Sequence, residues 1–497
     1  MAGFRLINLA KPFLPILPEV EVPYEKIPFD DKMVYTVFAS LIYLFAQFPL
    51  AGLRNATGED AAAHAPTVAD PLYFFRGVFA MEPKTCLEFG LLPIFAAGLF
   101  LQLLAGLKVI KVNFKLAADR QLFQSLTKIL AIAQYFVLAN IFIASGYYGA
   151  DLSLPQIVVL NIQLVGGGVF ACLLTEVIDK GFGLGSGAMI INTFAVATNL
   201  VSDTLGVNQI TVDSEGNTEP QGALINLIQG LRAQHKTLLG GIVSAFDRDY
   251  LPNLTTCVLV LALGCLVCYI QNIRFELPIR STRARGTNQM YPVQLVYTGS
   301  LSVLFSYVVL FYIHIAAFAL IQLVAKNDPA SIICKVLGHY ETVNNIIAAP
   351  TFPLSMLTPP RSLVGGALSQ PLSFVVYSFF ILASGVWFAY NWQQVSGMSA
   401  RDLARDFKEQ SITLLGRREQ SLPRELNKVI PVAATTGAMV LAAVTIAGEL
   451  LGLKGKGAGI VVGVAGGFSL LELITMEFQE SGGESSLANM LAGGLSL

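Results

Sequence analysis

The chain has 497 residues, of which 54% are hydrophobic and only 13% are charged, and its mean hydropathy is +0.62. Soluble domains carry roughly 25% charged residues, so this composition excludes a soluble globular protein and indicates one that lies mostly within a membrane. The formal net charge is −1, so only the local distribution of charge can point to partners.

The first residues predict a helix on the membrane surface, because Phe4, Ile7 and Leu9 alternate with polar residues before Pro12. Ten apolar segments follow, and a bilayer-spanning helix needs about 20 such residues. The predicted spans are 33–50, 86–107, 121–147, 154–177, 188–205, 253–273, 293–323, 372–392, 429–451 and 458–476. The sequence therefore predicts an all-α polytopic membrane protein with ten transmembrane helices.

A shorter apolar segment, 71–81, lies between the first two predicted spans, and its only charged residue is Arg76. It is too short to cross a bilayer. We therefore predict a re-entrant or plugging helix. A helix lying flat on the membrane surface is the alternative interpretation.

The spans divide into two groups of five. Five precede the segment 206–252 and five follow it. Because the number per group is odd, the two halves would be inverted relative to one another, as in many transporters and channels. We predict an N-terminal half at 1–205, a hinge segment at 206–252 and a C-terminal half at 253–497.

The loops on the side of the two termini hold 20 lysines and arginines, and the opposite loops hold 11. Lysine and arginine concentrate in cytoplasmic loops. We therefore predict that both termini are cytosolic, and that 71–81 and 206–252 lie on the luminal side.

Two arginine-bearing loops, 274–292 and 393–428, would project into the cytosol. The first contains four arginines and no lysine. In the second, Leu403 and Phe407 lie four residues apart, which predicts a short helix with one apolar stripe. Arginine binds phosphates through its planar fork, so the loops suggest a polyanionic partner. A positive-inside topology signal and a solvated basic linker are the alternatives.

Signs of catalysis or ion coupling are weak. Cys265 and Cys268 form a CxxC pair inside an apolar span without a second pair, so we expect them in the core. His314 is the only histidine in a predicted span. Ion-coupled carriers usually hold carboxylates near the membrane midplane, and such residues are nearly missing. We predict a passive conduit, with no enzyme activity, metal or cofactor.

Several motifs together resemble one family across nearly the whole chain. The two most specific are KGFGLGSG at 180–187 and ELPIRST at 276–282. The others are KPF at 11–13, LPEV at 17–20, DPLY at 70–73, LEFG at 87–90, DR at 119–120 and GRRE at 416–419. In these motifs the chain is similar to the SecY / Sec sixty-one alpha family of protein-conducting channel subunits. Within that family it most resembles the fungal second channel, the Sec sixty-one homologue.

The resemblance implies an hourglass pore between two five-helix halves, with 71–81 as its plug. Plug residues would include Pro71, Tyr73 and Arg76. A lateral gate would open between the second and third spans on one side and the seventh and eighth on the other. A ring of apolar side chains can seal such a pore by dewetting. Matching family positions gives Leu91, Phe95, Ala188, Asn192, Leu304 and Val462 for this ring.

Two positions depart from the family pattern. Tyr312 stands where the family often has a polar gate residue in the seventh span. A luminal glutamate that often pairs with the plug arginine aligns near Gly366, so we expect Arg76 to lack its usual ion pair. Both departures suggest that a signal sequence must be strongly hydrophobic to open the gate.

The implied function is co-translational passage of secretory proteins through an endoplasmic reticulum membrane, with lateral release of membrane segments. The resemblance implies as partners ribosomal RNA near the tunnel exit, the nascent chain with its signal sequence, beta- and gamma-type subunits, and the lipid bilayer. The residues expected to bind the ribosome are Arg280, Arg283, Arg285, Arg417 and Arg418. A small-solute transporter and a ribosome receptor without a pore are the alternatives.

Overall fold

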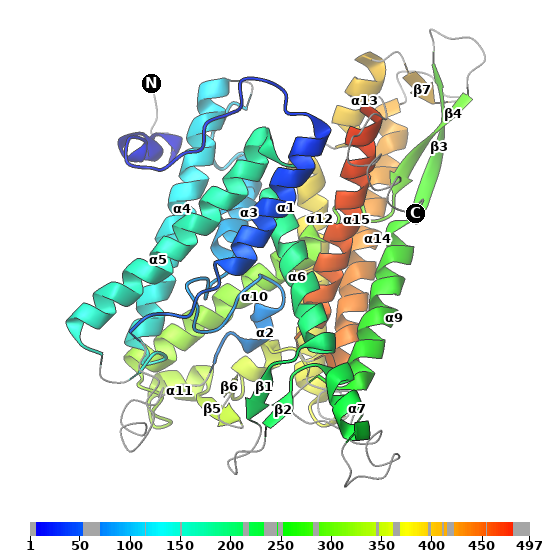
Figure 1. The fold of residues 1–497 in the computed structure, drawn as a ribbon. Helices are drawn as coiled ribbons and strands as arrows, with labels where there is room; N and C mark the ends of the chain where they lie inside the picture. The colour runs from blue at the N-terminus through cyan, green and yellow to red at the C-terminus, as the bar shows by residue number, and fades with distance from the viewer. Residues whose placement is uncertain are drawn as a thin grey trace, which may run out of the picture.

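The computed structural model describes residues 6–52, 70–114, 116–149, 152–211, 218–232, 246, 252–281, 288–343, 347–360, 368–395, 399–409, 412–414, 422–453 and 455–480. Its long helices pack side by side along the height of the molecule, with a small sheet at one end and short hairpins at the other (Figure 1).

Each of the ten predicted spans corresponds to one long helix. In the N-terminal half these are α1 (Phe29–Phe45), α3 (Leu92–Gly106), α4 (Ala117–Ala144), α5 (Leu154–Val177) and α6 (Gly187–Leu205). In the C-terminal half these are α9 (Leu254–Gln271), α10 (Leu301–Ala319), α12 (Pro371–Val395), α14 (Leu422–Gly448) and α15 (Gly457–Glu480). Among the described residues, eight helices are long and apolar enough to cross a membrane. The helices α1 and α3 are shorter, with 17 and 15 residues.

Capping residues determine where two of these helices begin. The backbone N–H of Ser153 donates to Oε1 of Gln156 at 2.9 Å, and Pro155 follows in the first turn of α5. The Oδ1 of Asn253 accepts from the backbone N–H of Thr256 at 2.8 Å at the start of α9. Both arrangements satisfy polar backbone groups that a helix end leaves free.

Two predicted spans begin too early. Residues 293 and 294 end the strand β4 (Asn288–Gln294), and α10 begins only at Leu301. Val293 pairs with Phe275 in the sheet, so its apolar character reflects strand packing and not a helix. Similarly, the helix of the predicted span 86–107 begins at Leu92, because 86–91 form turns that lead into it.

A three-stranded antiparallel sheet joins the two arginine-bearing loops. Its order is β4-β3-β7, with β3 at Arg274–Ser281 and β7 at Ile412–Leu414. The predicted helix of the second loop is present as α13 (Ala400–Glu409). Phe407 of α13 is buried with Ile279 and Leu414 in an apolar cluster separate from the main core. We call the sheet, α13 and this cluster the sheet module.

Short elements surround the two ends of the bundle. The N-terminal segment forms the 3₁₀ helix η1 (Leu6–Phe13), and its Ile7 and Ala10 pack with Phe123 of α4. The helices α7 (Ala223–Arg232) and α11 (Ile332–Leu337) lie at the opposite end from the sheet (Figure 1). They are accompanied there by the hairpins of β1 (Gln209–Thr211) with β2 (Thr218–Pro220) and β5 (Tyr340–Val343) with β6 (Ile347–Pro350).

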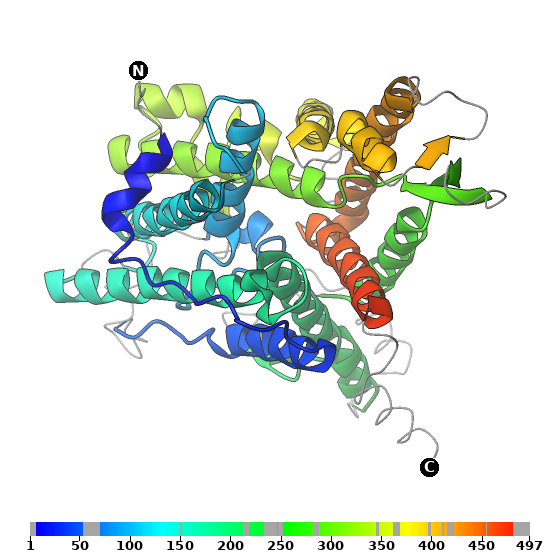
Figure 2. The same ribbon diagram turned by 90° about the horizontal axis from the view of Figure 1, so that it is seen from above.

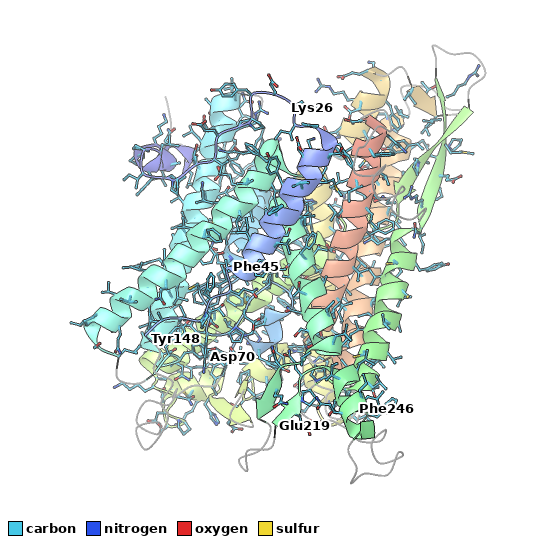
Figure 3. The ribbon with its side chains drawn as sticks, viewed as in Figure 1. Lys26, Phe45, Asp70, Tyr148, Glu219 and Phe246 are labelled. Atoms are coloured by element: carbon cyan, nitrogen blue, oxygen red, sulfur yellow. The ribbon has the colours of Figure 1, made fainter. Side chains whose placement is uncertain are left out.

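The main core is one apolar cluster to which all ten long helices contribute. Viewed from above, the helices surround a middle in which the short helix α2 (Tyr73–Arg76) lies (Figure 2). Figure 3 shows that α1 begins near Lys26 at one end of the molecule and ends at Phe45, well short of the other end. Asp70, the first described residue after residue 52, also lies inside the height of the bundle (Figure 3).

Candidate pore, plug and gate

The six predicted ring residues come from four different helices or their starts. Leu91 directly precedes α3, which carries Phe95; Ala188 and Asn192 lie on α6. Leu304 lies on α10 and Val462 on α15. All six are buried, and the five apolar ones belong to the same apolar cluster. The structure thus places the predicted ring in one continuous core.

Asn192 is the polar member of the ring. It is 0% exposed, and neither its Oδ1 nor its Nδ2 has a hydrogen-bond partner within the described part of the chain. A buried polar group without a partner costs about 1–3 kcal/mol. An opening that admits water to this position would remove that cost.

The predicted plug lies inside the bundle, directly against the ring. Phe75, Val78 and Phe79 are almost completely buried. The backbone N–H of Leu91 donates to the carbonyl of Phe79 at 2.9 Å, and the rings of Phe79 and Phe95 lie 6.3 Å apart. This position favours the re-entrant interpretation of 71–81 over a helix on the membrane surface.

The plug is less helical than the sequence suggested. The helix α2 covers only Tyr73–Arg76, and turns follow up to Met81. Ala80 has a φ of 53°, which a continuous right-handed helix cannot contain. The expectation of a helix over the whole of 71–81 is therefore wrong.

Arg76 has two carboxylate partners, so the expected loss of its usual family partner near Gly366 does not leave it without an ion pair. Its Nε lies 2.6 Å from Oδ2 of Asp70, and its Nη2 lies 2.5 Å from Oε1 of Glu88. Asp70 lies at the level of α2 (Figure 3). Burial acts to lower the pKa of Arg76, but attraction to Glu88 and Asp70 outweighs it and raises that pKa well above its ordinary value. Gly366, where the family glutamate aligns, lies outside the described residues.

Aromatic contacts and a hydrogen bond of Tyr312 join the helices of the predicted lateral gate. The hydroxyl of Tyr312 on α10 donates to Oε1 of Gln134 on α4 at 2.8 Å. Phe100 of α3 packs edge-on against Tyr312 and Phe305 of α10, with centroid distances of 6.3 and 5.9 Å. Phe305 stacks on Phe388 of α12 at 4.5 Å. The four helices named for the gate thus meet along one seam.

A cavity of about 810 Å³ reaches the predicted ring. Phe95 and Ala188 of the ring line it, as does Trp392 of α12. Its wall also contains Lys128, Glu176 and Lys180. Glu176 forms ion pairs with both lysines, at 2.8 Å to Lys180. The sequence analysis did not predict these ion pairs.

The lysines of this wall also hold the N-terminal segment in place. The Nζ of Lys128 donates to the carbonyl of Pro18, and the Nζ of Lys180 donates to the carbonyl of Val20. The chain between η1 and α1 therefore borders the cavity.

Only one of the five predicted ribosome-binding arginines lies in the described part of the chain. Arg280 is exposed on β3, where it pairs with Thr413 of β7. Arg283, Arg285, Arg417 and Arg418 lie outside the described residues. Because β3 and β7 are hydrogen-bonded neighbours, the sheet module brings the two loops together.

The two cysteines of the CxxC pair lie on the outer surface of the bundle. Cys265 and Cys268 are exposed on α9, so their expected core position is wrong; that face of α9 points away from the bundle. The histidine of the predicted seventh span is held by the backbone, since the Nε2 of His314 lies 3.2 Å from the carbonyl of Leu357. Among the described residues, no group of three or more His, Cys, Asp or Glu could hold a metal ion.

Sequence reasoning also missed Glu449, a fully buried carboxylate at the end of α14. Its signal was present, because the predicted span 429–451 contains this acidic residue near its end.

Comparison with known proteins gives a consistent result. The SecY family model matches residues 85–479, and the model for the plug domain of Sec61p matches residues 41–83. The chain is 67% identical to the Sec sixty-one protein homolog of Saccharomyces cerevisiae, over 99% of each chain. It is 34% identical to the protein transport protein SEC61 subunit alpha of Debaryomyces hansenii, over 96% of this chain and 97% of that protein.

Two solved structures are similar to this one. One is the idle yeast Ssh1 complex bound to the yeast 80S ribosome, with a TM-score of 0.78, 66% sequence identity and 98% coverage of each chain. The other, described as the structure of a protein conducting channel, has a TM-score of 0.74 at 22% identity, over 96% of this chain and 98% of that one. The second likeness concerns the fold alone.

Proposed function

The chain belongs to the SecY family, and we propose that it forms the pore of an endoplasmic reticulum channel through which secretory proteins pass during their synthesis. The observation that carries this function is the buried segment 71–81, which lies against Leu91 and Phe95 of the proposed ring. A segment that closes a central path and a cavity that leads to it are the parts a gated conduit needs.

The ten long helices would all be membrane spans in this assembly, with α1 and α3 as the two short ones. The halves 1–205 and 253–497 would move about the hinge 206–252. The loops on the side of the two termini hold more lysines and arginines than the opposite loops, which supports cytosolic termini. The chain would then lie in the lipid bilayer with its arginine-bearing loops toward the ribosome.

The ring residues Leu91, Phe95, Ala188, Asn192, Leu304 and Val462 would seal the idle pore, and Pro71, Tyr73 and Arg76 would belong to its plug. Membrane segments of the nascent chain would leave between α3 and α4 on one side and α10 and α12 on the other. Tyr312 of α10 contacts both α3 and α4 across that seam, which supports its assignment to the gate.

The ribosome is the main partner we propose, together with the nascent chain, its signal sequence and small beta- and gamma-type subunits. A solved structure of 66% identity is of a complex bound to the ribosome. Arg280, Arg283, Arg285, Arg417 and Arg418 would contact ribosomal RNA through its phosphates.

Neither alternative explains the structure as well. A small-solute transporter needs a polar binding site near the membrane midplane, whereas the described ring is apolar apart from Asn192. A ribosome receptor without a pore would explain the arginine-bearing loops but not the buried segment 71–81.

Site-specific crosslinking tests the proposal directly. Photoreactive groups at Leu91 and Leu304 are expected to crosslink to a secretory nascent chain on bound ribosomes. The matched control is Leu261, an exposed position on α9, which should not react with that chain. Ribosomes that remain bound with no crosslink from either ring position would show a docking receptor instead of a pore.

A further inference from the structure

Glu449 is a buried acid that the proposed function does not yet use. It is 0% exposed, and no lysine or arginine among the described residues forms an ion pair with it. It begins the π-helical turn Glu449–Leu453 that joins α14 to α15. Removing a charge from water costs several kcal/mol unless other groups compensate, so its surroundings must supply such groups.

The compensating groups are backbone N–H groups at the start of α15. The Oε2 of Glu449 accepts from the N–H of Gly455 at 2.6 Å, and its Oε1 accepts from the N–H of Ala458 at 3.4 Å. A Cβ at Gly457 would lie 2.8 Å from the same Oε1, so this position has no room for a side chain. The first N–H groups of a helix lack partners within it and favour a negative charge. Glu449 therefore holds the turn 455–459 in one conformation.

That turn is the surface on which the plug lies, and we call 455–459 the plug seat. A Cβ at Gly455 would lie 3.1 Å from the Cα of Phe74, and one at Gly459 would lie 2.1 Å from the carbonyl oxygen of Gly77. The plug and its seat thus meet backbone to backbone, without a side chain between them. Close packing of this kind fixes relative position more strictly than flexible side chains can.

The seat is also connected to the other half of the molecule. Lys456 of the seat forms an ion pair with Asp203 near the end of α6. The ring residue Val462 follows the seat on α15. A shift of the seat would therefore move the plug and Val462 and would disturb the ion pair between α6 and the seat.

We propose that Glu449 is the positioning residue of the plug: its carboxylate orders the plug seat so that the plug closes the idle pore and keeps it impermeable to ions. This inference rests on the proposed channel function. Within the described part of the chain, the hydrogen bonds of Glu449 go to the plug seat and not to the plug, so it would act through the backbone of 455–459.

The test is ion leak through the purified complex in vesicles without ribosomes or substrate. Glu449→Gln places an amide where a carboxylate accepts two N–H groups, and we expect the leak to rise about tenfold because a buried donor loses its acceptor. Glu449→Asp keeps the charge and is expected to restore part of the seal. Asp119→Asn is the matched control, since Asp119 is also buried and accepts the backbone N–H of Asn113 but lies away from the plug. It should leave the leak unchanged.

A reversible crosslink separates positioning from general weakening of the fold. A Cβ at Gly77 would lie 3.8 Å from the Cα of Lys456, which suits a disulfide between Gly77→Cys and Lys456→Cys. Oxidation of this pair should close the leak of the Glu449→Gln channel, and reduction should restore it. The same cysteine pair with Glu449 intact provides the reference in both redox states.

Two results would overturn the inference. In the first, the Glu449→Gln channel leaks no more ions than its parent, while a channel lacking 71–81 does leak. In the second, oxidation of the cysteine pair does not close the leak of the Glu449→Gln channel. In both cases the proposed channel function stands. A channel that stays tight without 71–81 and gives no nascent-chain crosslink from Leu91 would instead contradict the proposed function.

Discussion

The hydroxyl of Tyr312 donates a 2.8 Å hydrogen bond to Oε1 of Gln134, and this bond joins α10 of the C-terminal half to α4 of the N-terminal half. A hydrogen bond of this type contributes about 1 kcal/mol net. The ring of Tyr312 also packs edge-on against Phe100 of α3, and an aromatic pair adds about 0.5–1.5 kcal/mol beyond burial. One residue therefore stabilises the seam in two separable ways.

Substitutions at Tyr312 should change which signal sequences open the gate. Tyr312→Phe removes only the hydrogen bond, so we expect modestly better translocation of weakly hydrophobic signals. Tyr312→Asn removes the ring contact as well and should shift the hydrophobicity threshold further. The measurement is translocation of reporters whose signals differ stepwise in hydrophobicity. Tyr390→Phe, at an exposed position on α12, is the control. An unchanged substrate spectrum in Tyr312→Asn would refute this assignment.

The seam also contains a place where only glycine fits. A Cβ at Gly106 of α3 would lie 2.0 Å from Cγ2 of Val395 on α12. Gly106→Ala should therefore push these helices apart at a cost of about 1–3 kcal/mol, as overpacking does, and favour an open gate. We expect greater acceptance of weak signals in the same reporter assay.

Two further variants make the Gly106 prediction specific. Gly98 lies on the same helix, and a Cβ there would meet nothing within 4 Å, so Gly98→Ala should leave the threshold unchanged. Val395→Ala combined with Gly106→Ala should return it toward the parent value. If Gly98→Ala had the larger effect, helix propensity and not the contact with Val395 would be responsible.

Hydropathy predicted the long helices well, because each must bury its polar backbone and present about 20 apolar residues. The bounds of α5 agree with the predicted span 154–177, since Ser153 and Pro155 mark its start. The bounds failed at 293–300, where apolar residues belong to a strand and a turn that lead into α10. Hydropathy alone cannot distinguish a buried strand from the end of a helix.

Features that depend on contacts distant in sequence could not be predicted. The partners of Arg76 could not be predicted, because the family pattern places its partner near Gly366 and gives no sign of Asp70 or Glu88. Glu449 was overlooked because a single acid near a span end usually reaches toward water. Its actual environment depends on how α14 and α15 are joined, which no local pattern reveals. The ring stays a prediction from family positions; all six of its residues are buried, and the five apolar ones belong to the main core.

Binding to ribosomes should depend strongly on salt if the arginine-bearing loops contact RNA phosphates. Reversing Arg280, Arg417 and Arg418 to Glu should weaken binding and flatten the dependence of log affinity on log salt, because fewer counterions are released. The measurement is ribosome binding to vesicles containing the channel at several salt concentrations. Lys335→Glu is the control, since this exposed residue of α11 lies at the opposite end from β3 (Figure 1). If the ribosome affinity of the unsubstituted channel did not change with salt concentration, the proposed contacts would be contradicted.

Phe407 should matter for ribosome binding although it carries no charge. It is buried beneath the sheet, and its ring lies edge-on to Tyr291 of β4 at 5.0 Å. Phe407→Ala should cost about 3–5 kcal/mol of packing within a small cluster that holds β3, β7 and α13 together. We expect the two loops to lose their fixed relative position. Ribosome affinity should therefore fall although no arginine has been removed.

The matched control for this last prediction is Phe275→Ala, because Phe275 lies on β3 of the same sheet but is 56% exposed. It should bind ribosomes like the parent. The salt dependence of Phe407→Ala should also become shallower, since loops that are no longer held together cannot make all their phosphate contacts at once. If Phe407→Ala kept both the affinity and the salt dependence of the parent, each loop would bind independently and the sheet would have no role in docking.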